Sequence, residues 1–162
     1  MITILAIDPG DDSGFALYKD SWLADSGRLD IRDYFTVRDK LLEVSPSLVV
    51  IEDYYLSEKR TNIKTYLWYW HLWSVGAQTL GIHFEKVIPN KWEGYQESRH
   101  PECFEKRGKK KLTQWERQYP KKQGGDKKAF IKIAEKITGK TCLPDEADAI
   151  LIGDYWVHKG IK

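Results

Sequence analysis

The chain begins with an apolar run that ends abruptly in acidic residues. Residues 2–7 predict a buried strand, and Asp8 follows directly, before Pro9-Gly10 and two further aspartates. Acidic residues are poor strand formers and Pro-Gly is a turn signal, so we expect Asp8 where the strand passes into a loop. Its carboxylate would then lie at the rim of a sheet, and residues 14–18 would resume an extended strand.

Two further segments carry acids that the local pattern does not require. Glu52 follows the apolar run LVVI, and burying an ionised carboxylate is costly unless it is paired or bound to metal. A strand end that turns polar explains Glu52 equally well. Asp145 and Asp148 lie in LPDEADAILIG, where Pro144 starts a helix and the i, i+3 spacing places both acids on one face. Acids in a first turn also complement the helix dipole, which accounts for Asp145 and Glu146 but not for Asp148.

Acids on these three segments predict a metal site. Converging carboxylates repel one another, and hard divalent cations with oxygen ligands compensate for this repulsion. We expect Mg²⁺, with two ions about 3.5 to 4 Å apart, and Mn²⁺ as a possible substitute. Two such ions can activate a water molecule and stabilise the leaving oxygen of a phosphodiester in an in-line displacement.

Strand-like and helical patterns alternate along the chain. Strands are expected at residues 2–7, 14–18, 22–29, 47–55 and 82–89, and helices at 34–44, 61–80, 126–139 and 144–158. Residues 90–125 are polar and contain glycine, and we expect them to be irregular. The alternation predicts one α/β domain over residues 1–162, with a mixed sheet and a basic insertion at about 93–125.

Four blocks of this sequence resemble a known family. ILAIDPGDDSGFALY, LVVIEDYY, VIPNKW and LPDEADAILIG, in this order, are similar to the signature blocks of RuvC-type Holliday junction resolvases of the RNase H-like superfamily. The resemblance covers most of the chain, and the overall length of the chain suggests a compact form of the family, such as those of bacteriophages. It implies an RNase H-like fold, with a five-stranded mixed sheet flanked by helices. It also implies metal-dependent cleavage of four-way DNA junctions by a homodimeric endonuclease.

The resemblance carries over to four acids of this chain. It implies that Asp8, Glu52, Asp145 and Asp148 are the catalytic metal ligands, with Asp8 bridging two ions. A metal-bound water would attack phosphorus and leave a 5′-phosphate and a 3′-hydroxyl. The family's basic residues near the last helices suggest Lys127, ahead of Lys128, as an assistant near the scissile phosphate. A solvated lysine at a helix start explains either residue as well.

A basic segment contrasts with an otherwise acidic chain. Residues 99–128 contain eleven Lys or Arg residues and four acids, a net charge of +7 that leaves −5 for the rest. Phosphates attract such clusters, and the interleaved Phe104, Trp115 and Tyr119 can stack on exposed bases. A solvated loop would show the same mixture of basic and aromatic residues if its aromatic side chains anchored it to the rest of the domain. The predicted DNA-binding residues are Lys106, Arg107, Lys109, Lys110, Lys111, Arg117, Lys121, Lys122 and Lys128.

The helix expected at residues 61–80 is apolar or aromatic nearly all round. One face must pack on the sheet, and an exposed aromatic patch usually marks an interface. In RuvC-like enzymes the helix after the glutamate strand contributes to dimerisation, so we expect a homodimer that contacts through Tyr66, Trp70 and Trp73. A symmetric pair could cut opposite strands of a junction. The alternative is packing against residues 90–125 within one chain.

Composition excludes several classes of protein. With 162 residues, 41% of them hydrophobic, the chain can bury the core of one folded domain. It has no run of eighteen uncharged apolar residues and no secretory signal, so we expect no membrane partner and a cytoplasmic location, in a bacterium or a phage-infected host cell. The two cysteines, Cys103 and Cys142, lack the spacing of a zinc module or a disulfide framework.

The acids alone do not identify the substrate. A less selective branched-DNA or flap nuclease of the same superfamily, or a nuclease for RNA:DNA hybrids, would carry the same four residues. A non-catalytic nucleic-acid-binding module that keeps the fold is a further alternative. A sugar-kinase-like ATPase would need a second Gly-rich phosphate loop after a strand, and QGGDKK at 123–128 follows a basic segment instead. Acyl-transfer hydrolysis is disfavoured because no GxSxG motif occurs.

Overall fold

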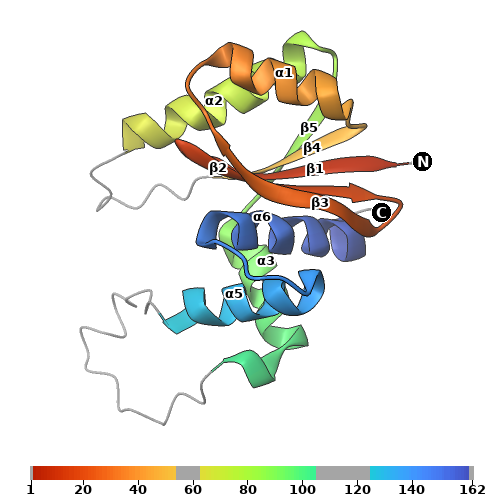
Figure 1. Ribbon diagram of the computed structural model, residues 1–162, viewed down its shortest axis with the longest axis vertical. Helices are drawn as coiled ribbons and strands as arrows, with labels where there is room; N and C mark the ends of the chain where they lie inside the picture. Colours follow the sequence, from red (N-terminus) through yellow and green to blue (C-terminus); the bar gives the residue numbers. More distant parts are fainter. Residues whose placement is uncertain (1, 54–62, 105–124, 161–162) are drawn as a thin grey trace.

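The computed structural model describes residues 2–53, 63–104 and 125–160, and a five-stranded mixed sheet lies at its centre (Figure 1). The strands are β1 (Thr3–Asp8), β2 (Asp12–Lys19), β3 (Trp22–Asp30), β4 (Leu48–Glu52) and β5 (His83–Val87). They lie side by side in the order β3-β2-β1-β4-β5. The first three form an antiparallel meander, whereas β4 is parallel to β1 and β5 is parallel to β4. The carboxyl ends of β1, β4 and β5 therefore meet at one edge of the sheet.

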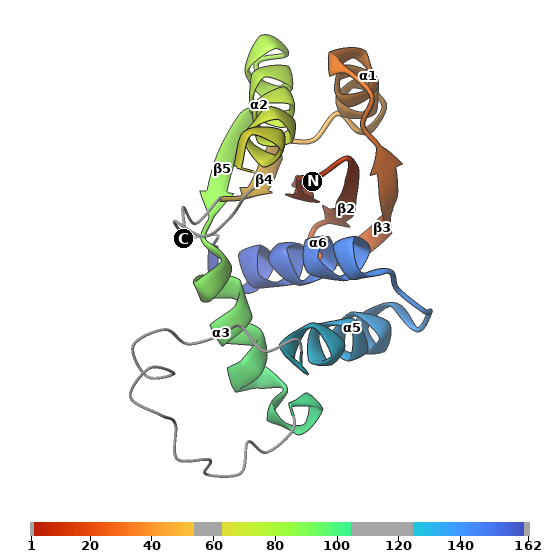
Figure 2. The same ribbon diagram turned by 90° about the vertical axis from the view of Figure 1, so that its left-hand side faces the viewer.

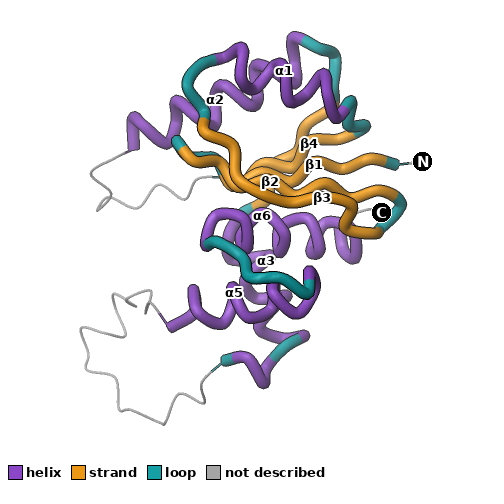
Figure 3. Tube along the Cα trace, viewed as in Figure 1, coloured by secondary structure: helices purple, strands orange, loops and turns teal. Residues whose placement is uncertain are grey.

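Helices cover both faces of this sheet (Figures 2 and 3). They are α1 (Tyr34–Val44), α2 (Ile63–Thr79), α3 (Pro89–Arg99), α5 (Gly125–Thr138) and α6 (Pro144–Tyr155), with short turns at η1 (Pro101–Cys103) and η2 (Trp156–Gly160). One face carries α1 and α2, and α6 lies along the other, with α3 and α5 packed outside it. None of the helices in the described ranges has the length and apolar character needed to cross a membrane.

The strand period of two divides the strand side chains between two cores. On β1, Leu5 and Ile7 pack with α1 and α2, whereas Ile4 and Ala6 pack with α6. Apolar residues on both faces require both faces to be covered, which explains why β1 and β4 are continuous apolar runs. By the same alternation, Asp8 lies on the α6 face. The predicted α/β architecture, a five-stranded mixed sheet flanked by helices, is confirmed.

Helix α6 lies unusually close to the sheet. A Cβ atom on Gly153 would be 2.3 Å from the Tyr18 ring, so only glycine permits this approach. The Tyr18 hydroxyl donates a buried hydrogen bond of 2.8 Å to the Ile150 carbonyl oxygen. These contacts fix the position of the helix that carries Asp145 and Asp148.

The expectation that residues 90–125 are irregular is wrong at their start. Helix α3 occupies Pro89–Arg99, with Pro89 in its first turn, and buries Trp92 and Gln96. Gln96 donates to the Leu151 carbonyl oxygen (3.3 Å) and to Asp154 Oδ2 (2.9 Å) on α6. The helix thus packs partly through a buried polar residue, which apolar periodicity does not reveal. Most of the predicted basic insertion, residues 105–124, lies outside the described residues.

The prediction that Trp73 contributes to a dimer interface is wrong, because its side chain is fully buried. It packs between α1 and the sheet, and its Nε1 donates to Ser13 Oγ at 3.1 Å. Trp70 is partly buried against Phe84 and its role at an interface stays a prediction. The Tyr66 side chain lies outside the described part of the structure. Among the α2 side chains that the structure describes, the exposed apolar residues are instead Leu67 and Trp68, at 45% and 56%.

Candidate active site

Asp8 and Glu52 end neighbouring parallel strands. The register pairs Ile7 with Ile51, and each acid is the next residue of its strand. Both strands run in the same direction, so both carboxylates reach the same edge of the sheet on the α6 face. Their convergence follows directly from strand pairing.

Helix α6 brings the two remaining acids to this edge. Its first turn, with Asp145, lies against β2 at Gly14, the residue that pairs with Asp8. Asp148 follows one turn later on the same helix, and its side chain is 17% exposed. The structure therefore gathers all four sequence-predicted acids at the end of β1.

Burial and charge both act on Asp8. Burial raises the pKa of the Asp8 carboxyl well above its ordinary value, and the charges of Glu52, Asp148 and Asp145 raise it further, while Lys127 acts in the opposite direction. A carboxylate that is hard to ionise in its surroundings binds a cation favourably, because the cation removes the repulsion. Asp8 is thus the electrostatic centre of the cluster.

Asp148 is held by the lysine that the sequence singled out. Lys127 Nζ on α5 lies 3.6 Å from Asp148 Oδ2, and this lysine is half exposed. Burial raises the pKa of the Asp148 carboxyl to about 6, even though the Lys127 charge lowers it. The charges of Asp145 and of Glu93 on α3 contribute to this rise in the pKa of Asp148. Glu93 is an acid near the site that the sequence did not identify.

Trp92 reaches the site from α3. Its Nε1 donates to Glu52 Oε1 at 3.0 Å, and its ring is buried against Phe130 with centroids 5.1 Å apart. Trp92 lies in the VIPNKW block. Because helix α3 was not predicted, the contact of Trp92 with Glu52 was not predicted either. Proline is favoured in the first turn of a helix, so Pro89 is the sequence signal that could have predicted helix α3.

Arg28 approaches the cluster from the opposite side. It lies on the edge strand β3, donates through Nη2 to Asp12 Oδ2, and its Nε lies 3.7 Å from Asp145 Oδ2. The sequence gave no reason to select it, because its neighbours are set by pairing of β3 with β2. Two cations from different elements, Lys127 and Arg28, therefore contact Asp148 and Asp145, respectively.

The carboxylate oxygen atoms at this site are ligands of the kind that a hard divalent cation prefers. Four carboxylates lie around one strand end, and their oxygen atoms are the ligands that Mg²⁺ and Mn²⁺ prefer. As the side chains stand, however, no three His, Cys, Asp or Glu side chains of the described ranges are grouped closely enough to hold an ion. Lys127, Arg28 and Trp92 each engage a different carboxylate, which is consistent with acids that stay apart until a cation joins them.

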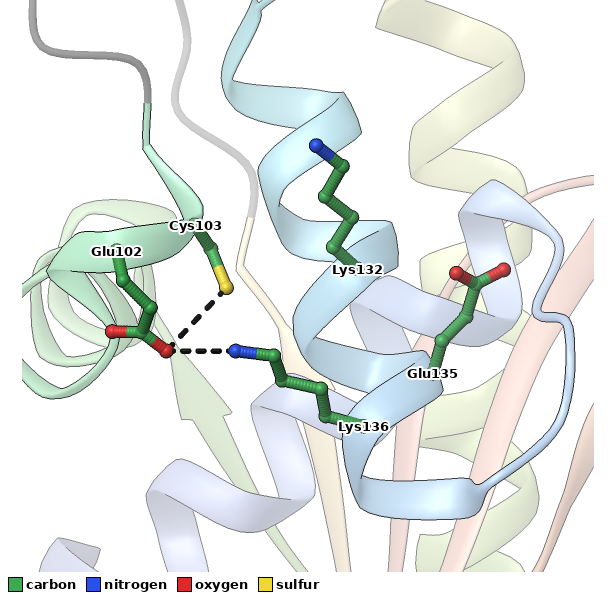
Figure 4. A pocket seen from close by; sticks show the side chains of 5 residues that line it. All are labelled: Glu102, Cys103, Lys132, Glu135 and Lys136. Carbon is green, nitrogen blue, oxygen red and sulfur yellow. Dashed lines mark hydrogen bonds and ion pairs between the residues drawn. The ribbon is translucent and has the colours of Figure 1, made fainter.

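The predicted DNA-binding residues are only partly visible. Lys128 is exposed near the start of α5, and the other eight lie within residues 105–124, outside the described ranges. A pocket of about 430 Å³ between η1 and α5 is lined by none of the four acids (Figure 4). In it Lys136 Nζ contacts Glu102 Oε1 at 2.8 Å, so the charge of this lysine is paired. This pocket is therefore separate from the candidate active site.

Solved structures of known proteins resemble this chain in fold. No protein-family model matches it, and no curated protein sequence does. The structure of RuvC from Thermus thermophilus in complex with a Holliday junction substrate aligns with a TM-score of 0.65 and 14% identity, over 99% of this chain and 97% of that one. A second structure of the same protein gives 0.62 and 14%, over 98% and 97%.

A viral protein has the same architecture. The fowlpox virus resolvase, in complex with Holliday junction DNA, aligns with a TM-score of 0.54 and 13% identity, over 96% of this chain and 98% of that one. These likenesses cover nearly the full length of each partner. The sequence resemblance to RuvC-type resolvases is therefore confirmed at the level of the fold.

Proposed function

We propose that this protein is a metal-dependent, structure-selective DNA endonuclease that resolves four-way junctions by paired hydrolysis of phosphodiesters. The observation that carries the proposal is the convergence of Asp8, Glu52, Asp145 and Asp148 at one strand end, where burial and then the charges of the other three raise the pKa of Asp8. Two solved structures of similar fold, both in complex with Holliday junction DNA, support a four-way junction as the substrate.

The four carboxylates would hold the metal, two Mg²⁺ ions in our proposal, with Mn²⁺ as a substitute. When bound, the metal would supply Lewis-acid stabilisation of charge on the phosphodiester. Asp8 is central because burial and three neighbouring carboxylates disfavour its ionised form, and a bound cation would offset this cost. Asp148 and Asp145 approach it from α6, and Glu52 is oriented by the Trp92 indole.

Basic residues of this chain would bind the DNA backbone. Lys127 contacts Asp148 and is half exposed, so its ammonium group can face a phosphate at the acid cluster. Lys128 lies beside it on α5, and the basic segment precedes this helix in the sequence. A homodimer would place two such sites on one symmetry axis, as paired cleavage requires. Action on DNA fits the cytoplasmic location expected from the sequence.

Cleavage of labelled DNA in Mg²⁺ tests the proposal. A four-way junction, a Y-shaped flap and a linear duplex are compared, with wild type and Asp8→Asn. We expect paired symmetrical nicks in the junction, which chelator and Asp8→Asn both abolish. Equal cutting of junction and flap would replace the proposal by a general branched-DNA nuclease. Tight junction binding without any cutting would indicate a non-catalytic binding module.

A further inference from the structure

Arg28 occupies one row of residues that crosses the sheet to the acid cluster. Arg28 on β3 pairs with Gly14 on β2, and Gly14 pairs with Asp8 on β1. The backbone of Asp145 lies over Gly14, in the middle of this row. Asp145 is therefore placed between a guanidinium on one side and the Asp8 carboxylate on the other.

The two contacts of Arg28 differ in strength. Its Nη2 makes a direct hydrogen bond to Asp12, whereas its Nε lies 3.7 Å from Asp145 Oδ2, beyond hydrogen-bond length. The Asp145 side chain is 36% exposed and Arg28 is 30% exposed, so neither is locked in place by packing. Arg28 is thus anchored on Asp12 and reaches Asp145 with its other edge.

The first turn of α6 does not depend on Arg28 for its position. Glu146, with only 8% of its side chain exposed, accepts hydrogen bonds from Ser26 Oγ (2.8 Å) and contacts Lys140 Nζ (2.9 Å). Gly14 and Gly153 add close backbone packing along the same helix. Loss of Arg28 should therefore change the surroundings of the Asp145 carboxylate and leave the helix in place.

We propose that Arg28 is a positioning residue that acts through Asp145 as a built-in counter-cation, and that a divalent ion must compete with it for this carboxylate. The inference rests on the proposed function. In the absence of metal, the guanidinium neutralises Asp145 and reduces repulsion within the acid cluster. When metal binds, Asp145 turns from Arg28 toward Asp8, and Arg28 stays with Asp12. Arg28 thereby sets the metal concentration at which the site fills.

Calorimetric titration of the DNA-free protein with Mn²⁺ tests this, beside thermal unfolding with and without the ion. For Arg28→Gln we expect the dissociation constant to fall about three- to tenfold, and the metal-free protein to unfold at a lower temperature. Arg28→Lys keeps the charge but cannot bridge two carboxylates with a planar fork, so it should shift the constant in the same direction. A long-range charge effect would leave Arg28→Lys like wild type, and that result would overturn the contact proposed here.

Arg32→Gln is the matched control. Arg32 lies just beyond β3 and pairs with Asp30 at 2.9 Å, but it is 81% exposed and touches none of the four acids. It should bind Mn²⁺ like wild type. If Arg28→Gln also binds like wild type, the inference is wrong while the proposed function stands. If wild type and Asp8→Asn show the same absence of Mn²⁺ uptake, the proposed function itself fails.

Discussion

The backbone of Asp145 lies directly over Gly14. A Cβ atom on Gly14 would be 1.9 Å from the Asp145 carbonyl oxygen and 2.3 Å from its carbonyl carbon. Since Gly14 pairs with Asp8, the missing side chain is what lets the first turn of α6 approach the end of β1. The glycine in the opening motif thus determines the distance between two of the four acids.

Gly14→Ala should therefore displace the start of α6. Backbone atoms cannot yield as a flexible side chain does, so we expect a loss of about 3 kcal/mol in the free energy of unfolding, measured in urea. Mn²⁺ binding should weaken as well, because Asp145 moves away from Asp8. Gly94→Ala is the control, since a Cβ there meets nothing within 4 Å inside α3. It should be neutral or stabilise by up to about 1 kcal/mol. Equal stability of the two variants would contradict the close approach.

Trp92→Phe should affect the site more than the fold. The variant keeps a buried ring but loses the indole N–H that donates to Glu52 Oε1 at 3.0 Å. We expect a stability loss of about 1 kcal/mol and a roughly tenfold lower cleavage rate, because Glu52 loses its orientation. Single-turnover cleavage and urea unfolding measure the two effects.

Trp22→Phe serves as the control for Trp92→Phe. Trp22 is 80% exposed at the start of β3, beside Lys19 and therefore at the opposite end of the sheet from Asp8. It should cleave like wild type. Equal rates for all three proteins would mean that the Trp92 contact does not orient Glu52 in the reaction.

The sequence predicted the acid cluster well because strand ends are a local property. Asp8 and Glu52 each follow an apolar run, and parallel neighbours necessarily end at the same edge. Arg28 could not be predicted in this way, since its contact with Asp145 depends on the pairing of β3 with β2 and on the position of α6. Contacts that three elements create together leave no pattern in any one of them.

Helices were predicted less well where their buried face is not simply apolar. Helix α2 is aromatic nearly all round, so periodicity could not tell that Trp73 is buried while Trp68 is exposed. Helix α3 was missed because one of its two buried residues is Gln96, whose amide nitrogen donates to Asp154. In both cases the partner across the interface decides which face is buried.

In the absence of metal, the acid cluster should lower the free energy of unfolding as pH rises, whereas a carboxyl group with a lowered pKa would raise it. Burial raises the pKa of the Asp148 carboxyl to about 6, so between pH 4 and pH 6 the folded chain binds a proton that the unfolded chain has lost. This contribution, on the order of 3 kcal/mol, is fully present below pH 4 and is lost as pH rises from 4 to 6. Asp8, whose pKa is also raised, contributes with the same sign.

Metal should reverse this trend. Mg²⁺ competes with protons for the same carboxylates, so it should raise the melting temperature more at pH 7.5 than at pH 5. Thermal unfolding at both values, with Mg²⁺ and with chelator, measures the difference. Asp8→Asn should remove most of the metal effect and raise metal-free stability at pH 7.5. A metal effect that is independent of pH would contradict binding at these acids.

Exposed residues of α2 allow the predicted homodimer to be tested. With Trp73 buried, Leu67 and Trp68 are the exposed apolar residues among the described side chains of this helix, and an acid at position 68 would be buried without a partner in a symmetric contact. We expect wild type to sediment as a dimer at tens of micromolar, and Trp68→Glu as a monomer that nicks junctions without pairing the cuts. Trp22→Glu makes the same exchange at an exposed tryptophan on β3 and should remain dimeric. A monomeric wild type would remove the dimer, and a dimeric Trp68→Glu would place the interface on another surface.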